Sequence, residues 1–127
     1  MAQAVFNDMA KKAGVDAAAF SRGLAADGSG ISENARAVLL DMGLDASGHI
    51  SKTVSRDDIE SADYVIGISS RHAARLMAEF PEFCEKVYAF PFDVPDPFGG
   101  NKAVYENTLC EIKRGIELII REVFGSD

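Results

Sequence analysis

One apolar run limits the folds open to this chain more than any other feature. Residues Tyr64-Val65-Ile66-Gly67-Ile68 carry no charge and show no alternation between apolar and polar side chains. Such a run is typical of a strand that is covered on both faces, as in a parallel sheet. Parallel strands need a crossover connection between them, which is usually a helix. The run therefore predicts an α/β domain.

Helical patterns flank this run on both sides. The spacing of apolar residues predicts helices over residues 1–13, 32–43, 56–61, 70–80 and 102–124, and two further strands over residues 17–24 and 87–90. Ser32 is expected to cap the second helix, and Ser55 with Asp58 to form a capping box. Together these elements predict a three-layer sandwich, in which helices flank a short parallel sheet.

The beginning of the chain does not fit this pattern. α/β domains usually start with a strand, and their functional loops follow the carboxyl ends of strands. Here a helix is predicted from residue 1, and three predicted strands are few for five predicted helices. We therefore expect that the first, central strand of the sheet is missing.

Composition and charge limit the partners and the location expected for this chain. The 127 residues fit one domain, expected over residues 1–127, and the net charge of -7 repels phosphate backbones and anionic membranes, so neither nucleic acid nor membrane is an expected partner. No apolar run approaches the ~20 residues that span a bilayer, and no secretion signal is present. A cytoplasmic location is expected.

Cysteine and histidine give little sign of a metal or redox centre. Cys84 and Cys110 are too few for a disulfide framework and lack C-x-x-C spacing, and we expect both to be buried as small apolar residues. His49 and His72 have no second ligand at a metal-binding spacing, and His72, near a predicted helix start, is expected to face solvent or to cap that helix. No cofactor and no metal are expected.

Five segments, in this order, resemble parts of the low-molecular-weight protein-tyrosine phosphatase family. They are Met1-Ala2-Gln3-Ala4-Val5-Phe6, Ser21-Arg22-Gly23, Asp45-Ala46-Ser47-Gly48-His49-Ile50-Ser51-Lys52, Ala62-Asp63-Tyr64-Val65-Ile66 and Asp96-Pro97-Phe98-Gly99-Gly100. The first is similar to the segment after the family's phosphate loop, and the last to its acid loop. In the third segment, Lys52 stands where the family usually has arginine.

The resemblance implies a cysteine-dependent mechanism. In the family, a thiolate in a Cys-x5-Arg-Ser loop attacks phosphorus, the arginine binds the phosphate oxygens, and an aspartic acid protonates the leaving group. The resemblance assigns Asp96 as this general acid and Phe98 as an aromatic wall beside the substrate. Read without the resemblance, Asp96 belongs to an ordinary Asp-Pro turn and Phe98 is a loop anchor.

The catalytic loop itself is not in the sequence. Cys84 is followed at the required spacing by Phe90, and Cys110 by Ile116, so neither begins a Cys-x5-Arg motif. We therefore expect an N-terminally truncated phosphatase-like domain that is inactive as it stands. With its loop restored, the expected substrate is a phosphorylated protein carrying phosphotyrosine or phosphoarginine, because the D-P-F-G-G form resembles the branch that includes bacterial arginine phosphatases. Arsenate reductase activity belongs to a related class of proteins and stays a further alternative. It usually requires additional cysteines, and none can be identified in this sequence.

Two other interpretations stay open. In the first, the chain is a non-catalytic binding or regulatory remnant that self-associates through unpaired sheet edges and forms a homo-oligomer. In the second, it is an unrelated α/β interaction domain. The family interpretation requires Asp96 to lie close to the N-terminus of the first helix, whereas an unrelated domain would place the two far apart.

Overall fold

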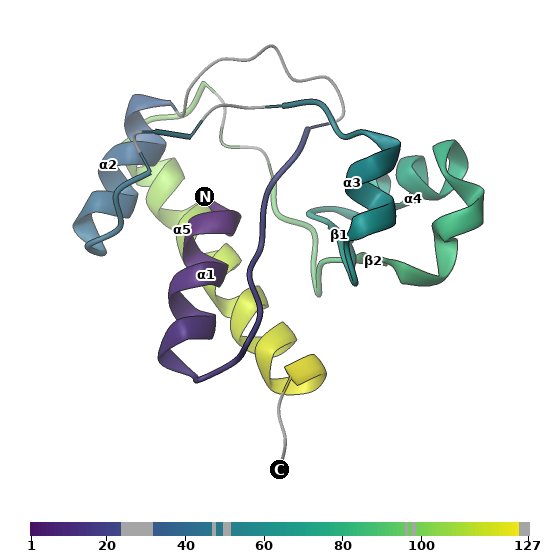
Figure 1. The fold of residues 1–127 in the computed structure, drawn as a ribbon. Coiled ribbons are helices and arrows are strands. Elements are labelled where there is room, and N and C mark those ends of the chain that lie inside the picture. Colours follow the sequence, from purple (N-terminus) through teal and green to yellow (C-terminus); the bar gives the residue numbers. More distant parts are fainter. Residues whose placement is uncertain (24–31, 47, 50–51, 96, 98, 125–127) are drawn as a thin grey trace.

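Two groups of elements lie side by side in the protein. The computed structural model describes residues 1–23, 32–46, 48–49, 52–95, 97 and 99–124. In Figure 1, one group holds the helices α1, α2 and α5, and the other holds α3, α4 and the strands β1 and β2. The extended chain after α1 passes between the two groups. The extended chain thus lies between the helical group and the group that holds the strands.

The first group is a helical layer built on the long C-terminal helix. α1 (Ala2–Lys12) and α2 (Glu33–Asp41) both pack on α5 (Lys102–Ile119), which continues into a π-helical turn, η2 (Ile120–Phe124). The Ser32 side chain accepts a hydrogen bond from the Ala35 N–H and caps α2 as predicted. The buried core of this group comprises Val5, Ala35, Val38, Leu39, Phe90, Val94, Tyr105, Leu109, Ile112 and Ile116.

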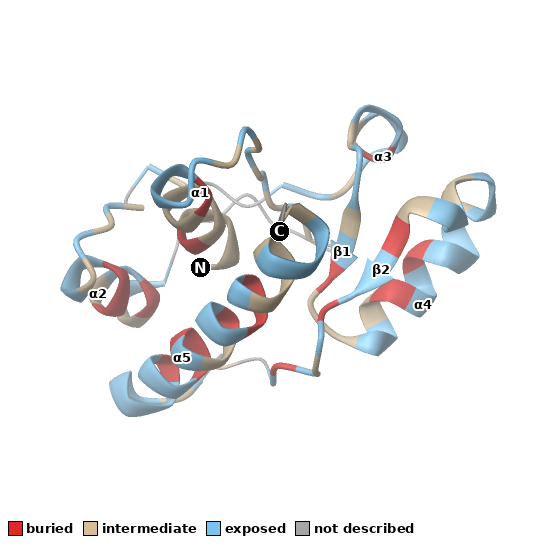
Figure 2. Cartoon of the chain, turned by 90° about the horizontal axis from the view of Figure 1, so that it is seen from below, coloured by how far each residue is buried: buried red, intermediate tan, exposed pale blue. Residues whose placement is uncertain are grey.

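The second group is a small α/β unit. It contains α3 (Arg56–Ser61), β1 (Val65–Gly67), α4 (Ser70–Glu79), a 3-10 helix η1 (Pro81–Lys86) and β2 (Val87–Ala89). β1 and β2 are parallel, with Val65 opposite Val87 and Gly67 opposite Ala89. Ile59, Ala73, Leu76 and Val87 form its buried core, and Figure 2 shows the buried side of α4 turned toward the strands. The predicted α/β class, with a short parallel sheet flanked by helices, is confirmed.

The strand predicted over residues 17–24 is wrong as a regular strand. Within the described part of this stretch, only Gly23 forms a parallel bridge, which pairs it with Thr53. The backbone of Ala19 instead bonds to the side chain of Asn7, and the Ser21 N–H donates to Gln3. Helix side chains thus take the place of a strand ladder, and Leu24 lies outside the described residues.

Several burial predictions are also wrong. The run at 64–68 is not covered on both faces, because Tyr64 is 46% exposed and Ile66 is 40% exposed. Among the described residues, β1 pairs with β2 alone, so no further strand covers these side chains. The apolar spacing of residues 70–80 also predicts that Met77 faces inward, but Met77 is 37% exposed, since a two-stranded sheet covers only the narrow stripe of α4 around Ala73 and Leu76.

Burial was also wrongly predicted in the C-terminal helix and at the two cysteines. The apolar spacing of residues 102–124 predicts that Val123 lies on the buried stripe of the last helix. Val123 is instead 45% exposed, because it lies in the π-helical turn, where the wider backbone turn changes the register of the stripe. Cys84 and Cys110 are both exposed rather than buried. They lie on the solvent-facing sides of η1 and α5, so neither contributes to a core.

Across the described ranges, no helix is both long enough and apolar enough to cross a bilayer.

Candidate active site

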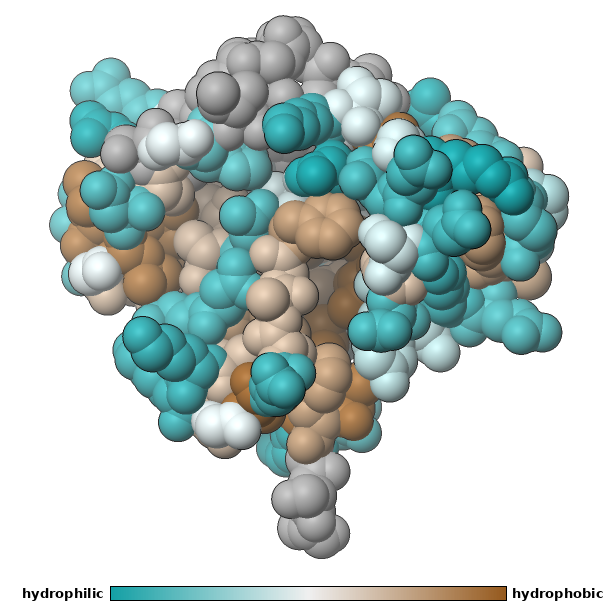
Figure 3. Space-filling model, in the orientation of Figure 1, coloured by the Kyte–Doolittle hydropathy of each residue, from teal (hydrophilic) through white to brown (hydrophobic). Residues whose placement is uncertain are grey.

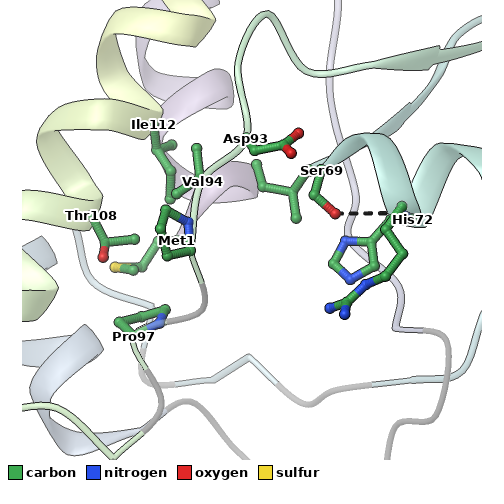
Figure 4. Close-up of a pocket in the computed structure, with 11 residues that line it drawn as sticks. Met1, Ser69, His72, Asp93, Val94, Pro97, Thr108 and Ile112 are labelled. Carbon is green, nitrogen blue, oxygen red and sulfur yellow. Dashed lines mark hydrogen bonds between the residues drawn. The ribbon is translucent and has the colours of Figure 1, made fainter.

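A cavity of about 500 Å³ opens where β1 ends. Four parts of the chain line it: the start of α1, the β1–α4 connection, the loop after β2 and one face of α5. Figure 4 draws the lining residues, which are Met1, Ile68, Ser69, Arg71, His72, Asp93, Val94, Pro95, Pro97, Thr108 and Ile112. The cavity therefore lies at the carboxyl edge of the sheet, where α/β proteins carry their ligand sites.

The N-terminal end of α1, which is the positive end of the helix dipole, borders this cavity. Met1 caps α1 without a side-chain hydrogen bond, and the first turn contains no acidic residue. Burial lowers the pKa of the Met1 amino group, because the charged form loses solvation there. Free N–H groups at a helix start favour bound anions, and here no carboxylate in the first turn competes for them.

The loop after β2 is tied to the start of α4. The Ser70 N–H donates to the Asp93 carboxylate over 2.8 Å, and the Ser70 hydroxyl donates to the other carboxylate oxygen over 3.2 Å. Ser69 caps the same helix by accepting from the His72 N–H. Asp93 thus fixes the loop that follows it relative to α4.

Asp96 and Phe98, the two site residues predicted from the sequence, lie outside the described residues. Their neighbours are described: Pro95 and Pro97 line the cavity together with Met1. The Gly100 N–H donates to the Pro97 carbonyl over 2.8 Å and closes a turn in which Gly99 has a positive φ of 83°. The chain on both sides of Asp96 is therefore beside the start of α1.

Sequence reasoning missed most of the cavity wall. Asp93, Ser69 and Arg71 were not singled out, and His72 was interpreted as a solvent-facing or capping residue. The available signal was position, because Ser69 and Arg71 follow the apolar run directly, at the carboxyl end of a strand. Among the described residues, no cluster of three or more histidine, cysteine, aspartate or glutamate side chains could hold a metal ion.

Comparisons with known proteins place this geometry in a family. Residues 1–124 match the family model described as "Low molecular weight phosphotyrosine protein phosphatase". The chain is 26% identical to a protein-arginine-phosphatase of Bacillus subtilis, over 97% of this chain and 87% of the relative. It is 29% identical to a protein-arginine-phosphatase of Geobacillus stearothermophilus, over 78% of this chain and 71% of the relative.

Solved structures agree with the sequence comparison. A low-molecular-weight protein tyrosine phosphatase from T. tengcongensis has a TM-score of 0.91 and 30% identity, covering 96% of this chain and 88% of that one. A YwlE mutant from Bacillus subtilis also reaches a TM-score of 0.91, at 24% identity, and supports the fold alone. Since the family model matches nearly the whole sequence, the chain belongs to the low-molecular-weight phosphotyrosine protein phosphatase family.

Proposed function

We propose that these 127 residues form the acid and substrate side of a protein phosphatase, and that by themselves they do not hydrolyse phosphorylated proteins. One observation carries the proposal. The start of α1 and the loop that contains Asp96 border the same cavity, whereas the sequence contains no Cys-x5-Arg segment. The cavity thus has room for a phosphate between a helix N-terminus and an acid loop, but the chain lacks the nucleophile.

The chemistry requires a phosphate loop joined to the start of α1. A cysteine thiolate there would form a bond to phosphorus while the bond from phosphorus to the leaving atom breaks. Asp96 would give its proton to that leaving atom and then take a proton from the water that hydrolyses the phosphocysteine. The role of Asp96 belongs to this proposal, as does that of Phe98 as a wall for the substrate side chain.

Phosphoarginine is the substrate to test first. Two of the relatives are named protein-arginine-phosphatases, and the Asp96–Gly100 segment has a single aromatic residue. Phosphotyrosine is the alternative, since a third relative from Bacillus subtilis, 27% identical, is a low-molecular-weight protein-tyrosine-phosphatase. Both are phosphorylated side chains of proteins, so the proposed partner is a phosphorylated protein.

A restored enzyme tests the proposal. An apolar strand followed by Cys-x5-Arg-Ser is fused in front of Met1, and release of phosphate from phosphoarginine and phosphotyrosine peptides is compared with that of the 127-residue chain. We expect turnover only in the fused protein. Asp96→Asn should slow that turnover by about 10²–10⁴-fold and change nothing in the shorter chain. Equal losses in both proteins would contradict the proposal.

A non-catalytic, self-associating module is the second candidate. It is favoured by exposed apolar side chains: Phe20 is 49% exposed and Tyr88 is 48% exposed. Such surface beside unpaired strand edges promotes association. Sedimentation over a hundredfold range of concentration tests it, and a monomer throughout that range would exclude it.

A further inference from the structure

The stretch of chain between β2 and the acid loop is held from two sides. Phe90 and Val94 are both buried in the core of the helical group, and the half-buried Phe92 packs against the same core. Asp93, which lies between Phe92 and Val94, is turned the other way, because its carboxylate bonds to the start of α4. Alternate residues of the stretch thus contact the two groups of elements just before the acid loop begins.

The contact between Asp93 and α4 uses both carboxylate oxygens. One accepts from the Ser70 N–H over 2.8 Å, and the other accepts from the Ser70 hydroxyl over 3.2 Å. Ser70 is the first residue of α4, so its N–H has no acceptor inside the helix. Ser69 already caps α4 by accepting from the His72 N–H. The helix therefore does not depend on Asp93 for its cap, whereas the stretch that carries Asp93 is tied to the helix.

This contact is directional, unlike the apolar packing around it. Figure 3 shows apolar residues along the middle of one face, between two hydrophilic flanks. The hydrophobic effect has no preferred direction, whereas a hydrogen bond weakens steeply when its angle is bent. The two hydrogen bonds from Ser70 to Asp93 therefore set where the following loop lies relative to α4.

The other end of the acid loop is attached to the helical group. The Asn34 amide, on α2, donates to the Gly100 carbonyl over 3.3 Å, and the Gly100 N–H donates to the Pro97 carbonyl over 2.8 Å. Asn101 then caps α5 by accepting from the Val104 N–H. The loop is thus tied to α4 before it starts and to α2 and α5 where it ends.

Only Val94 and Pro95 separate Asp93 from Asp96 in the sequence. Val94 is buried, and the ring of Pro95 fixes its φ angle. These two residues can therefore absorb little of a shift that begins at Asp93. Proton transfer needs the acid within hydrogen-bond distance of the leaving atom, and a displacement of about 1 Å can cost roughly 10²-fold in rate.

We propose that Asp93 is a positioning residue, which holds the Asp96 carboxyl at the leaving atom by binding Ser70 at the start of α4. The inference rests on the proposed role of Asp96 as the general acid. In that step the phosphoryl group passes to the thiolate of the fused phosphate loop, and the electron pair of the broken bond stays on the leaving oxygen. Asp96 gives its proton to that oxygen. Asp93 transfers no proton and acts through Ser70.

Two single variants break the contact from opposite sides. Asp93→Ala removes both acceptors, and Ser70→Pro removes both donors. Proline is favoured at the first position of a helix, so α4 should tolerate it. Ser69, the residue before it, already has the extended backbone that a following proline requires, with φ -139° and ψ 161°. The second variant thus keeps the test valid if the first does not fold.

Hydrogen exchange of the 127-residue chain tests the anchor itself. The Ser70 amide should exchange at least roughly tenfold faster in Asp93→Ala than in the native chain, because it loses its acceptor. The Gly100 amide, which closes the turn at the other end of the loop, should exchange faster in both variants. Ser55→Ala, which removes the cap of α3, is the matched control for lost stability and should leave both amides unchanged.

The fused protein then separates positioning of the acid from a merely structural role. Phenyl phosphate has a leaving oxygen that needs a proton, whereas dinitrophenyl phosphate has one that is stable without it. Asp93→Ala and Ser70→Pro should each lower kcat at least roughly tenfold on phenyl phosphate and less than about twofold on dinitrophenyl phosphate. Asp93→Asn keeps an oxygen that accepts from the Ser70 N–H, so its loss should be smaller. Because Asp93 and Ser70 form one contact, the double variant should lose no more than either single variant.

Three results would overturn the inference: unchanged exchange of the Ser70 amide in Asp93→Ala, equal loss of kcat on the two phosphate esters, or additive losses in the double variant. A fused native protein without any turnover would contradict the proposed function. Exchange of the Ser70 and Gly100 amides in the unfused chain would then still decide whether Asp93 holds the loop.

Discussion

At the scale of single residues, the Asp58 side chain takes part in both a helix cap and a long-range ion pair. Its carboxylate accepts from the Ser55 N–H over 3.0 Å, and its own N–H donates to the Ser55 hydroxyl, which completes the capping box of α3. The same carboxylate pairs with Arg22 over 3.0 Å. The sequence predicted the capping box from its local spacing, but the Arg22 contact spans 36 positions and has no local signal.

The charge of Asp58 should make stability depend on pH. The Ser55 N–H hydrogen bond, and then the Arg22 charge, hold the pKa of Asp58 below its ordinary value of 3.8. The folded state therefore gains stability above that value and loses it as pH falls through the lowered pKa. Urea unfolding from pH 2 to 7 should show Asp58→Asn less stable at pH 7, with a difference that shrinks in acid.

The alanine variant at the same position completes that test. Asp58→Ala removes the side-chain half of the capping box as well as the charge, and it should cost about 1 kcal/mol more in unfolding free energy at every pH. A difference between the native chain and Asp58→Asn that stays constant down to pH 2 would show that the charge is not the cause.

Gly67 sets the distance between β1 and α4. A Cβ at this position would lie 2.5 Å from the Ala73 backbone nitrogen, so Gly67→Ala must push the helix away from the strand. We expect a loss of about 1–3 kcal/mol in unfolding free energy, measured with urea. Gly48→Ala is the matched control, since nothing lies within 4 Å of its Cβ, and a similar loss there would count against a steric cause.

At the scale of elements, local signals were sufficient for the helices. Ser32 and Ser55 marked helix starts that the structure confirms, because caps depend on residues a few positions away. The extended segment at 19–23 failed as a strand prediction for the opposite reason. Its partners are side chains of α1 and one bridge to Thr53, none of which its own sequence indicates.

The tether between α1 and this segment should therefore be measurable. Asn7→Ala leaves the Ala19 N–H and carbonyl without their side-chain partner, which should cost about 1–3 kcal/mol and speed exchange of the Ala19 amide. Asn7→Asp keeps the acceptor and should retain part of the protection. If Ala19 exchanges at the same rate in all three proteins, the segment is held by something other than Asn7.

The candidate site shows the same division between local and distant information. Asp96 and Phe98 were assigned only through the family resemblance, and their roles remain proposals. Ser70 and Asp93, by contrast, are separated by 23 positions and meet only once α4 and the loop after β2 are folded. A single sequence contains no signal for that contact.

At the scale of the whole molecule, the chain has two separate hydrophobic cores with few apolar connections between them. Phe90, which follows β2 directly, belongs to the core of the helical group and packs against Gly115, where a Cβ would overlap its ring. It is a principal apolar connection between the sheet and α5. The two groups should therefore unfold as separate units.

Two buried leucines, one in each core, test this independence. Leu39→Ala should lower the exchange protection of α1, α2 and α5, and Leu76→Ala that of α4 and the strands, with losses of about 2–5 kcal/mol. Native-state hydrogen exchange measures both. A uniform loss across the molecule from either substitution would show a single cooperative unit instead.

The two exposed cysteines have a practical consequence for that question. Cys84 lies on η1 and Cys110 on α5, so each group of elements presents one reactive thiol to solvent. A donor and an acceptor dye attached to these two cysteines of the native chain would report the distance between the two groups by energy transfer, without any engineered residue. The native protein thus contains the two attachment points needed to measure, in single molecules, whether its two groups of elements separate or close.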